Sequence, residues 1–369
     1  MKFDLFNVPR IVFGSGAIAR LAELLPTFGR EPLVIYNGNP TRIYELLSQA
    51  NLSAVGKHQR GEPTIKDIDC ALGLARENNC DFVIALGGGS AIDAGKAVAG
   101  LLSNGGVATD YMEVVGKGQK IIKPAVPWIA IPTTAGTGAE VTRNAVIGWP
   151  EKKFKASLRS ELLMATVALI DPELGVDVPP DVTARTGMDA LCQCIEAYVS
   201  NGANPMTDVI AIKGVELASR HLKRAFDNGH DLEAREAMAL AALLGGIALT
   251  NAGLGAVHGF AAPIGANFPV PHGTVCAVLL PHVIRANTAL GNEKAKEKYR
   301  RIDACIGGNA AATCMALVRD LRLPSLGSFG MNERDVKPMV QLAKRASSMR
   351  YNPVILDDAT LADILRAGL

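Results

Sequence analysis

Charged residues are missing from one long stretch of this 369-residue chain. Residues 237–284 contain no Asp, Glu, Lys or Arg, although these residues make up 20% of the whole. Such a stretch could be mistaken for membrane spans, but Gly245-Gly246, Pro263 and Pro269 interrupt it. It also lacks the flanking asymmetry of Lys and Arg that orients membrane helices. We therefore expect a buried helical core here.

The chain also lacks an excess of charge of either sign, with a formal net charge of +2. Nothing in this balance favours a nucleic acid or a membrane surface as a partner.

A framework of paired cysteines is missing too, because the seven cysteines are odd in number. This usage is typical of a reducing compartment, and we expect most of the cysteines to pack in the core. The N-terminal segment MKFDLFNVPR is too short and too polar for a signal peptide. A cytoplasmic location follows.

The length exceeds what one hydrophobic core normally supports, so two domains are expected. The first half alternates β-type runs, at residues 33–36, 82–86 and 128–131, with helical patterns. This alternation predicts a parallel sheet covered by helices. A hairpin-like signature precedes it at residues 10–16. From about Pro180 the chain reads as helix after helix. We predict an α/β domain over residues 1–179 and an all-α domain over residues 180–369.

Four polar side chains in the second half have the chemistry of metal ligands. Asp189 and Gln193 are four residues apart in a helical pattern, so both project from one helix face. His258 and His272 lie within the uncharged stretch. A single histidine there would more often be an ordinary core residue. Two histidines with a carboxylate favour a buried divalent cation, and this donor set suits zinc or ferrous iron.

A first glycine-rich element, FVIALGGGSAIDAGKAVAG, has features of a nucleotide-binding turn. A buried strand ends at Leu86, three glycines follow, and Ser90 is expected to cap the next helix. Backbone N–H groups at that helix start would bind a pyrophosphate. Alone the element is weak, because ordinary strand-to-helix turns also use glycine.

A second element, PTTAGTGAEVTRNAVI, is more specific. Thr133, Thr134 and Thr137 place hydroxyl groups around Gly136 and Gly138, which suits contacts to phosphate and ribose. A loop whose threonines only cap its own turns stays open as the alternative.

The motifs GGGSAIDAGKA, PTTAGTGAEVT, GMDAL with IEAYVS, His258-Gly259 and PHG at residues 271–273 together resemble the iron-containing (group III) alcohol dehydrogenase family. The resemblance spans nearly the whole chain, and the motifs follow the family's order. It implies a Rossmann-like α/β N-terminal domain and an all-α, metal-binding C-terminal domain. It also implies NAD(P) held beside a divalent metal, Fe²⁺ or Zn²⁺, in the cleft between the domains.

The resemblance also implies roles for individual residues. Asp189, His258 and His272 match three metal ligands and would be catalytic through the metal. The family's fourth ligand, usually histidine, is Gln193 here, and Ala262 stands where many members carry another active-site histidine. Cofactor-binding roles fall on Gly88, Gly89, Ser90, Asp93, Thr133, Thr134, Thr137 and Lys155.

Cofactor preference depends on the residues after the second strand, where NAD-specific folds place a carboxylate that binds the ribose 2′-OH. Asn37 and Gly38 occupy this place, without an acid, and Arg42 follows. We count Asn37 and Gly38 among the cofactor contacts and lean slightly towards NADP, with NAD allowed. Arg42 as an ordinary solvated helix residue is an equally good interpretation.

The predicted function is a metal-dependent, NAD(P)-linked alcohol dehydrogenase or aldehyde reductase that acts on a small alcohol or carbonyl compound. Gln193 could complete the metal shell, bind through water or orient the substrate. Without a histidine at Ala262, water or a ribose hydroxyl would relay the proton.

Other functions stay open. A metal-independent reductase similar to maleylacetate reductases competes most seriously. A lyase or cyclase similar to dehydroquinate synthases would need a basic pocket for a phosphate. It is disfavoured, because residues 237–284 contain no Lys or Arg. A non-catalytic descendant would not need the cofactor motifs. The apolar segment of residues 11–13 before the first α/β unit also predicts a strand that pairs across the two-fold axis of a homodimer.

Overall fold

The computed structural model describes residues 2–369 and divides into two compact units of different architecture. The α/β unit comprises Phe6–Thr134 and Ala139–Gly175. The helical unit comprises Val176–Leu369 and also includes Ala135–Gly138 and the N-terminal segment up to Leu5. The predicted boundary between residues 179 and 180 lies close to the change at Gly175. The assignment of residues 135–138 to the helical unit was not predicted.

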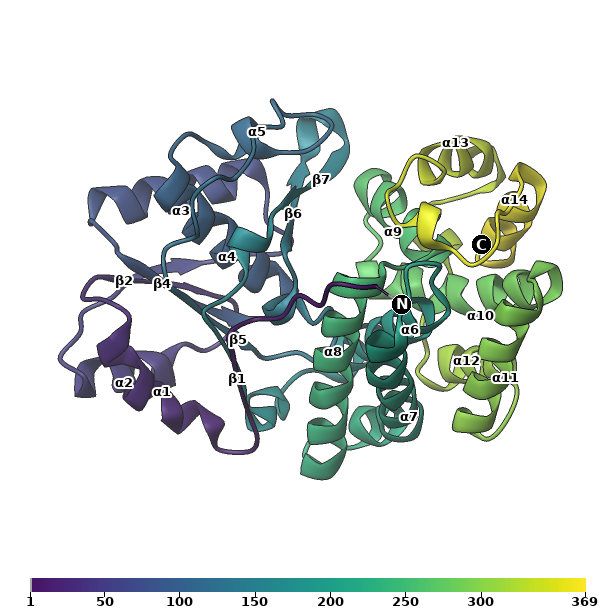
Figure 1. The fold of residues 1–369 in the computed structure, drawn as a ribbon, viewed down its shortest axis with the longest axis horizontal. Helices are drawn as coiled ribbons and strands as arrows, with labels where there is room; N and C mark the ends of the chain where they lie inside the picture. Colours follow the sequence, from purple (N-terminus) through teal and green to yellow (C-terminus); the bar gives the residue numbers. More distant parts are fainter. Residues whose placement is uncertain (1) are drawn as a thin grey trace. The chain divides into compact units, whose positions relative to one another are not determined.

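Within residues 2–369, a six-stranded parallel sheet organises the α/β unit (Figure 1). The strand order is β1-β8-β5-β4-β2-β3, and every neighbouring pair is parallel. The strands are β1 (Arg10–Phe13), β2 (Pro32–Tyr36), β3 (Val55–His58), β4 (Phe82–Gly87), β5 (Trp128–Pro132) and β8 (Val167–Ile170). Every residue of β4, β5 and β8 is buried, as expected for strands covered on both faces.

Helices cover both faces of this sheet (Figure 1). The helices are α1 (Leu21–Leu24), α2 (Thr41–Gln49), α3 (Ile65–Glu77), α4 (Gly89–Asn104) and α5 (Ala108–Tyr111). On one face, α1 and α2 share a hydrophobic cluster with the strands, and Leu21, Leu46 and Ile84 all belong to it. On the other face α4 approaches β4 closely, because a Cβ on Gly95 would lie 2.5 Å from that of Ala85.

The N-terminal strand differs from the hairpin-like prediction, which is wrong. β1 pairs in parallel with β8, with Val12 opposite Leu169. The chain therefore does not fold back on itself here, but adds its first strand to the end of the sheet. Asp171, directly after β8, stabilises the turn that follows β1. Its carboxylate accepts hydrogen bonds from the N–H groups of Gly16 and Ile18 at 3.2 and 3.0 Å.

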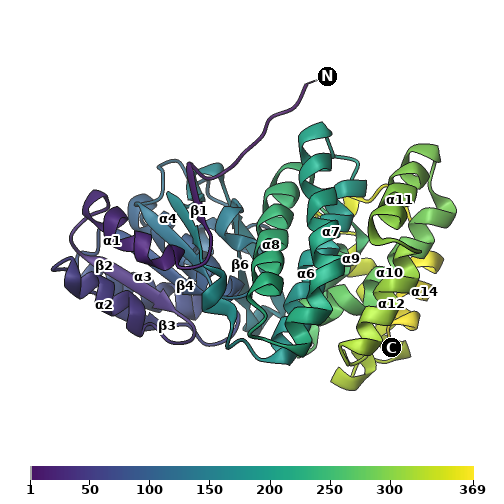
Figure 2. The ribbon, with the colours of Figure 1, turned by 90° about the horizontal axis from the view of Figure 1, so that it is seen from below.

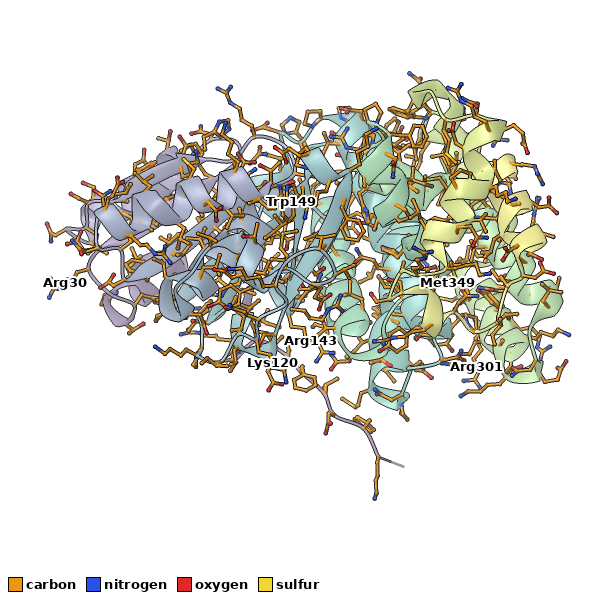
Figure 3. All side chains as sticks on the ribbon, turned by 90° about the horizontal axis from the view of Figure 1, so that it is seen from above. Arg30, Lys120, Arg143, Trp149, Arg301 and Met349 are labelled. Carbon is orange, nitrogen blue, oxygen red and sulfur yellow. The ribbon has the colours of Figure 1, made fainter. Side chains whose placement is uncertain are left out.

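An antiparallel pair, β6 (Asn144–Trp149) and β7 (Phe154–Arg159), lies outside the main sheet. Trp149 ends β6 (Figure 3). The Nζ atom of Lys152 lies 3.7 Å from the ring centroid of Trp149. Arg143, just before β6, stacks over the ring of Phe6 at 5.0 Å. The pair therefore has its own surface contacts and a link to the N-terminal segment.

The helical unit consists of a succession of helices, as predicted. They are α6 (Pro180–Val199), α7 (Pro205–Asp227), α8 (Leu232–Ala252), α9 (Ala256–Asn267), α10 (His272–Leu290), α11 (Glu293–Ile306), α12 (Ala310–Asp320), α13 (Glu333–Ala343) and α14 (Asp358–Ala367). The helix α6 is buried almost throughout its second half and packs against α7, α8 and α10; α6, α7 and α8 lie side by side in Figure 2.

The uncharged stretch of residues 237–284 forms most of α8, all of α9 and the first part of α10. By length and composition alone, α10 could cross a membrane, as could α8 with α9, although these two helices are bent by 100°. However, 67% of the apolar window of α10 is buried inside the protein. The stretch supplies much of the hydrophobic cluster of the helical unit, in agreement with the buried helical core that its composition predicted.

Candidate active site

Three predicted ligand residues converge inside the helical unit from three helices. Asp189 comes from α6, His258 from α9, and His272 from the first residue of α10. The Oδ1 atom of Asp189 lies 3.3 Å from Nε2 of His258 and 3.6 Å from Nε2 of His272. The side chains of Asp189 and His258 are 2% and 7% exposed, but that of His272 is 37% exposed. The cluster is thus accessible on its His272 side.

The helix α6 directs several polar groups to this cluster from one face. Gln193 donates a hydrogen bond from Nε2 to Oδ2 of Asp189 at 3.2 Å, so the two side chains meet as their spacing predicted. One turn further, Glu196 accepts a hydrogen bond from the N–H of Val257 at 2.7 Å. Glu196 was not predicted as a site residue. It lies seven residues after Asp189, and this helical spacing was the signal that could have identified it.

Glu196 decides which nitrogen of His258 faces the cluster. Its Oε2 atom lies 2.7 Å from Nδ1 of His258, so Nδ1 carries the hydrogen of this bond in the neutral ring. The Nε2 lone pair then points towards Asp189. A carboxylate behind the histidine fixes the ring orientation and raises its basicity, as is usual for metal-ligating histidines.

Two buried acceptor atoms of this cluster have no hydrogen-bond partner within residues 2–369. They are Oδ1 of Asp189 and Oε1 of Gln193. Burial is the main cause that raises the pKa of Asp189, and the two histidines only partly offset it. Unpaired buried acceptors are costly. A divalent cation bound to Oδ1 and to both Nε2 atoms would remove this cost for Asp189, so the residues fit Zn²⁺ or Fe²⁺.

Two thiols also lie against the histidines. The Sγ atom of Cys276 is 3.6 Å from Nε2 of His272 and 3.8 Å from Nε2 of His258. The Sγ atom of Cys192 is 3.9 Å from Nδ1 of His258. The sequence predicted only packing roles for most cysteines. Cys276 follows His272 by four residues on α10, so the spacing rule that linked Asp189 with Gln193 would have linked this pair too.

Glycines let the helices of the cluster approach one another. A Cβ on Gly273, beside His272, would lie 2.0 Å from the carbonyl oxygen of Arg185 on α6. A Cβ on Gly255 would lie 2.7 Å from Oε1 of Glu196. Any side chain at these two positions would therefore push α10 or α9 away from α6. This requirement explains a glycine directly after His272.

In the α/β unit, most of the candidate cofactor residues lie at the carboxyl edge of the sheet. They follow three neighbouring strands, with Asn37 and Gly38 after β2, Gly88, Gly89 and Ser90 after β4, and Thr133 and Thr134 after β5. The N–H of Asn37 donates to the carbonyl of Leu86 at 2.9 Å, and that of Thr133 donates to the carbonyl of Gly87 at 3.0 Å. Open parallel α/β sheets bind ligands outside this edge.

The start of α4 differs from the prediction in one detail. The helix begins at Gly89 and its N-cap is Gly88, without a side-chain hydrogen bond. Capping by Ser90 is therefore wrong, because Ser90 lies inside the first turn and not before it. The first N–H groups of α4 have no side-chain cap, which suits an anionic phosphate. Gly87 has φ of +145°, a backbone conformation that favours glycine.

Asp93 and Lys155 have partners within the α/β unit. The N–H of Val146 on β6 donates to Oδ2 of Asp93 at 3.0 Å, and Nζ of Lys96 lies 3.6 Å from Oδ1. Lys155 on β7 forms an ion pair with Glu62. In this structure both candidate cofactor residues hold the β6–β7 pair. Thr137, the remaining candidate, is part of the helical unit.

Arg42, whose charge favoured NADP, lies in the first turn of α2. Its Nη1 atom is 3.2 Å from Oε2 of Glu45, and both side chains are about half exposed, at 51% and 52%. Arg42 therefore already has a carboxylate partner, and it would have to exchange this exposed pair for a 2′-phosphate.

A parallel α/β unit with a glycine-rich edge, followed by a helical unit with a carboxylate and two histidines, defines a class of two-unit oxidoreductases. The sequence model described as "Iron-containing alcohol dehydrogenase" matches residues 9–172, and the one described as "Fe-containing alcohol dehydrogenase family, C-terminal" matches residues 183–369. The chain therefore belongs to the iron-containing alcohol dehydrogenase family, which confirms the resemblance found in the sequence.

Individual relatives match over nearly the whole chain. Alcohol dehydrogenase 4 of Schizosaccharomyces pombe is 36% identical over 370 residues, covering 96% of this chain and 86% of the relative. The NAD-dependent methanol dehydrogenase of Bacillus methanolicus is 33% identical over 387 residues, covering 99% and 100%. The crystal structure of a 1,3-propanediol oxidoreductase superimposes with a TM-score of 0.93 at 32% identity, covering both chains fully.

Proposed function

We propose that this protein is a metal-dependent, nicotinamide-linked alcohol dehydrogenase or aldehyde reductase. The observation that carries the proposal is the meeting of Asp189, His258 and His272 around an unpartnered carboxylate oxygen. Membership of the iron-containing alcohol dehydrogenase family supports it. The names of the relatives also support small alcohols as substrates, since they include a methanol dehydrogenase and a 1,3-propanediol oxidoreductase.

The roles of the residues follow from their contacts. Asp189, His258 and His272 would hold Fe²⁺ or Zn²⁺, which when bound supplies Lewis-acid polarisation of the substrate oxygen. Glu196 orients His258 through Nδ1. Gln193 holds Oδ2 of Asp189, so that Oδ1 stays directed at the two imidazoles. The proton leaves through water or a cofactor ribose hydroxyl, because Ala262 offers no imidazole.

The carboxyl edge of the sheet is the proposed dinucleotide site. NAD(P) supplies the hydride acceptor or donor. Its pyrophosphate would lie on the uncapped N–H groups at Gly88, Gly89 and Ser90, and its ribose near Asn37 and Gly38. The other proposed contacts are Thr133, Thr134, Thr137, Asp93 and Lys155. The slight lean towards NADP rests on Arg42 and on the missing acid after β2.

The substrate is proposed to be apolar and short or medium in length. Residues 249–271 are mostly small and uncharged, and no Lys or Arg among them would hold an anionic group. The partial exposure of His272 offers access on one side of the cluster. A small alcohol or aldehyde is therefore favoured over a carboxylate or phosphate substrate.

We expect oxidation of NADH or NADPH when the purified, metal-loaded protein is given a panel of aliphatic and aromatic aldehydes. The absorbance of the reduced nicotinamide measures the rate, and bound metal is quantified on the same sample. Comparing both cofactors tests the lean towards NADP. If the protein holds metal but turns over none of the aldehydes, the proposal is contradicted.

A metal-independent reductase, similar to maleylacetate reductases, is the second candidate. The observation in its favour is the orientation of Gln193, whose amide nitrogen and not its oxygen faces Asp189. Activity that survives complete removal of metal by a chelator would select this alternative. Activity that is lost with the metal and returns with Zn²⁺ or Fe²⁺ would exclude it.

We also propose a homodimer in the cytoplasm. Free cysteines, most of them buried, suit a reducing compartment. The strand β1 stands at one end of the sheet order, next to β8, and pairing with a second copy would cover this edge. Light scattering is expected to give twice the monomer mass at working concentrations. A monomer there would contradict the dimer.

A further inference from the structure

A fourth possible donor atom lies beside the three predicted metal ligands. Asp189, His258, His272 and Cys276 each offer one ligand atom, and these atoms all lie within 4.8 Å of one another. Cys276 is completely buried in the helical unit. It lies one helical turn after His272, so its Sγ atom and the imidazole of His272 project from the same side of α10.

The spacing of the donors matches the edges of a metal-centred tetrahedron. Zinc bonds of about 2.0–2.1 Å to nitrogen or oxygen and about 2.3 Å to sulfur imply edges of about 3.3 Å between N and O and about 3.6 Å between N and S. The oxygen–nitrogen distances from Asp189 are 3.3 and 3.6 Å. The sulfur–nitrogen distances from Cys276 are 3.6 and 3.8 Å. Small shifts of the side chains would therefore let all four donors hold one cation, and the substrate oxygen would then add a fifth ligand.

Gln193 is less suited to be the fourth donor. Its Nε2 atom, which cannot coordinate a cation, faces Asp189. Its Oε1 atom lies towards α8, where it is 3.2 Å from the place of a Cβ on Gly245. Turning the amide over would set its oxygen against Oδ2 of Asp189 and lose the hydrogen bond between them. Gln193 therefore acts on the site by holding Asp189.

Cys192 is also less suited. Its Sγ atom lies near Nδ1 of His258, at 3.9 Å, on the side of the ring that Glu196 occupies. The cation would bind on the opposite side, at Nε2. Of the two thiols near His258, only that of Cys276 shares the side of the ring that faces Asp189 and His272.

We propose that Cys276, and not Gln193, is the fourth protein ligand of the metal. This inference rests on the proposed function, because it assumes a cation at Asp189, His258 and His272. On binding, the thiol loses its proton to solvent and a metal–sulfur bond forms, with no change of oxidation state. An O, N, N, S donor set favours zinc over ferrous iron, because thiolate is a soft ligand.

Cobalt substitution tests the ligand directly and without an activity assay. The metal-free protein is loaded with Co²⁺, cobalt is counted per subunit, and the near-ultraviolet spectrum is recorded. We expect an intense thiolate-to-cobalt charge-transfer band in the parent protein. Cys276→Ser and Cys276→Ala should lose the band, while the matched control Cys192→Ser keeps it. Circular dichroism of each variant shows whether it is folded.

Zinc affinity gives the second measurement, by competition with a chromophoric chelator. Cys276→Ser is expected to weaken zinc by more than about 10-fold, since a direct ligand contributes at least as much as an outer partner. Cobalt bound without the band in the parent would overturn the role of Cys276 but leave the metal site intact. A band that only Cys192→Ser removes would also overturn it. No cobalt or zinc bound at all would overturn the proposed metal-dependent function as well.

Discussion

Asp189→Ala is expected to abolish metal binding and activity, whereas Gln193→Ala should keep substantial metal and measurable activity. Asp189 is the anionic member of the cluster, and its Oδ1 atom lies near both imidazoles. Gln193 touches the cluster through Oδ2 of Asp189. Losing such an outer partner typically weakens metal binding by about 10–100-fold, and losing a direct anionic ligand costs more. His272→Ala should behave like Asp189→Ala.

The decisive measurement is metal content per subunit after dialysis against a mild chelator, for the three variants beside the parent. Activity on the best aldehyde is measured on the same samples. Equal loss of metal in Gln193→Ala and Asp189→Ala would contradict a merely positioning role for Gln193. A parent protein that never retains a divalent ion would remove the Lewis-acid mechanism and favour the metal-independent reductase.

The central strands and the start of the helical region could be predicted from local patterns. The predicted strands fall within β2, β4 and β5, and α6 begins at Pro180 as expected. These strands are buried runs of apolar residues that end at glycine, asparagine or proline, so the local sequence alone indicates a strand. The prediction succeeded where burial on both faces imposes a continuous apolar run.

Other strands could not be predicted because their identity depends on distant partners. The strand β3 contains Lys57 and His58 and is only partly buried, so it resembles a loop in sequence. β1 was assigned to a hairpin, because its true partner β8 lies more than 150 residues away, as the contact between Gly16 and Asp171 illustrates. Only the packed sheet determines such a pairing.

The candidate metal site was partly predictable for a similar reason. Asp189 and Gln193 share a helix face by spacing alone, and the uncharged stretch drew attention to His258 and His272. Their meeting depends on how α6, α9 and α10 pack, which no local pattern contains. Glu196 and Cys276 were missed although helical spacing links each to a predicted ligand. The expectation that most cysteines pack in the core concealed Cys276, and Glu196 was not compared with Asp189 by its spacing.

The largest effect on stability is expected from Lys96→Met in the α/β unit. The side chain of Lys96 is 0% exposed, and its ammonium group donates to the carbonyls of Ala139 and Asn144, both at 2.8 Å, and to the hydroxyl of Thr142 at 2.7 Å. All three ammonium hydrogens are thus used. Methionine has similar volume but leaves these acceptors and Asp93, whose side chain is only 15% exposed, without a cation. Breaking such a buried pair costs about 3–5 kcal/mol.

Urea unfolding followed by tryptophan fluorescence measures this effect in the right unit, because Trp128 and Trp149 both belong to the α/β unit. Lys66→Met is the matched control. Lys66 is an exposed residue of α3, and the same substitution there should change the free energy of unfolding by less than about 0.5 kcal/mol. Equal stability of the two variants would show that Lys96 does not hold this unit together.

The cost of Lys96→Met should also grow with pH. Burial raises the pKa of Glu140 from its ordinary 4.5 to about 7, and Lys96 acts in the opposite direction by favouring the charged carboxylate. A carboxyl group whose pKa is raised in the folded state contributes stability below pH 4.5 that is lost as the pH rises towards 7. Without Lys96 the folded-state pKa rises further, so the loss extends to higher pH. The gap between Lys96→Met and the parent should therefore be smaller at acidic pH than above neutrality. A gap that is constant across this range would show that Lys96 stabilises the unit through hydrogen bonds alone and not through its charge.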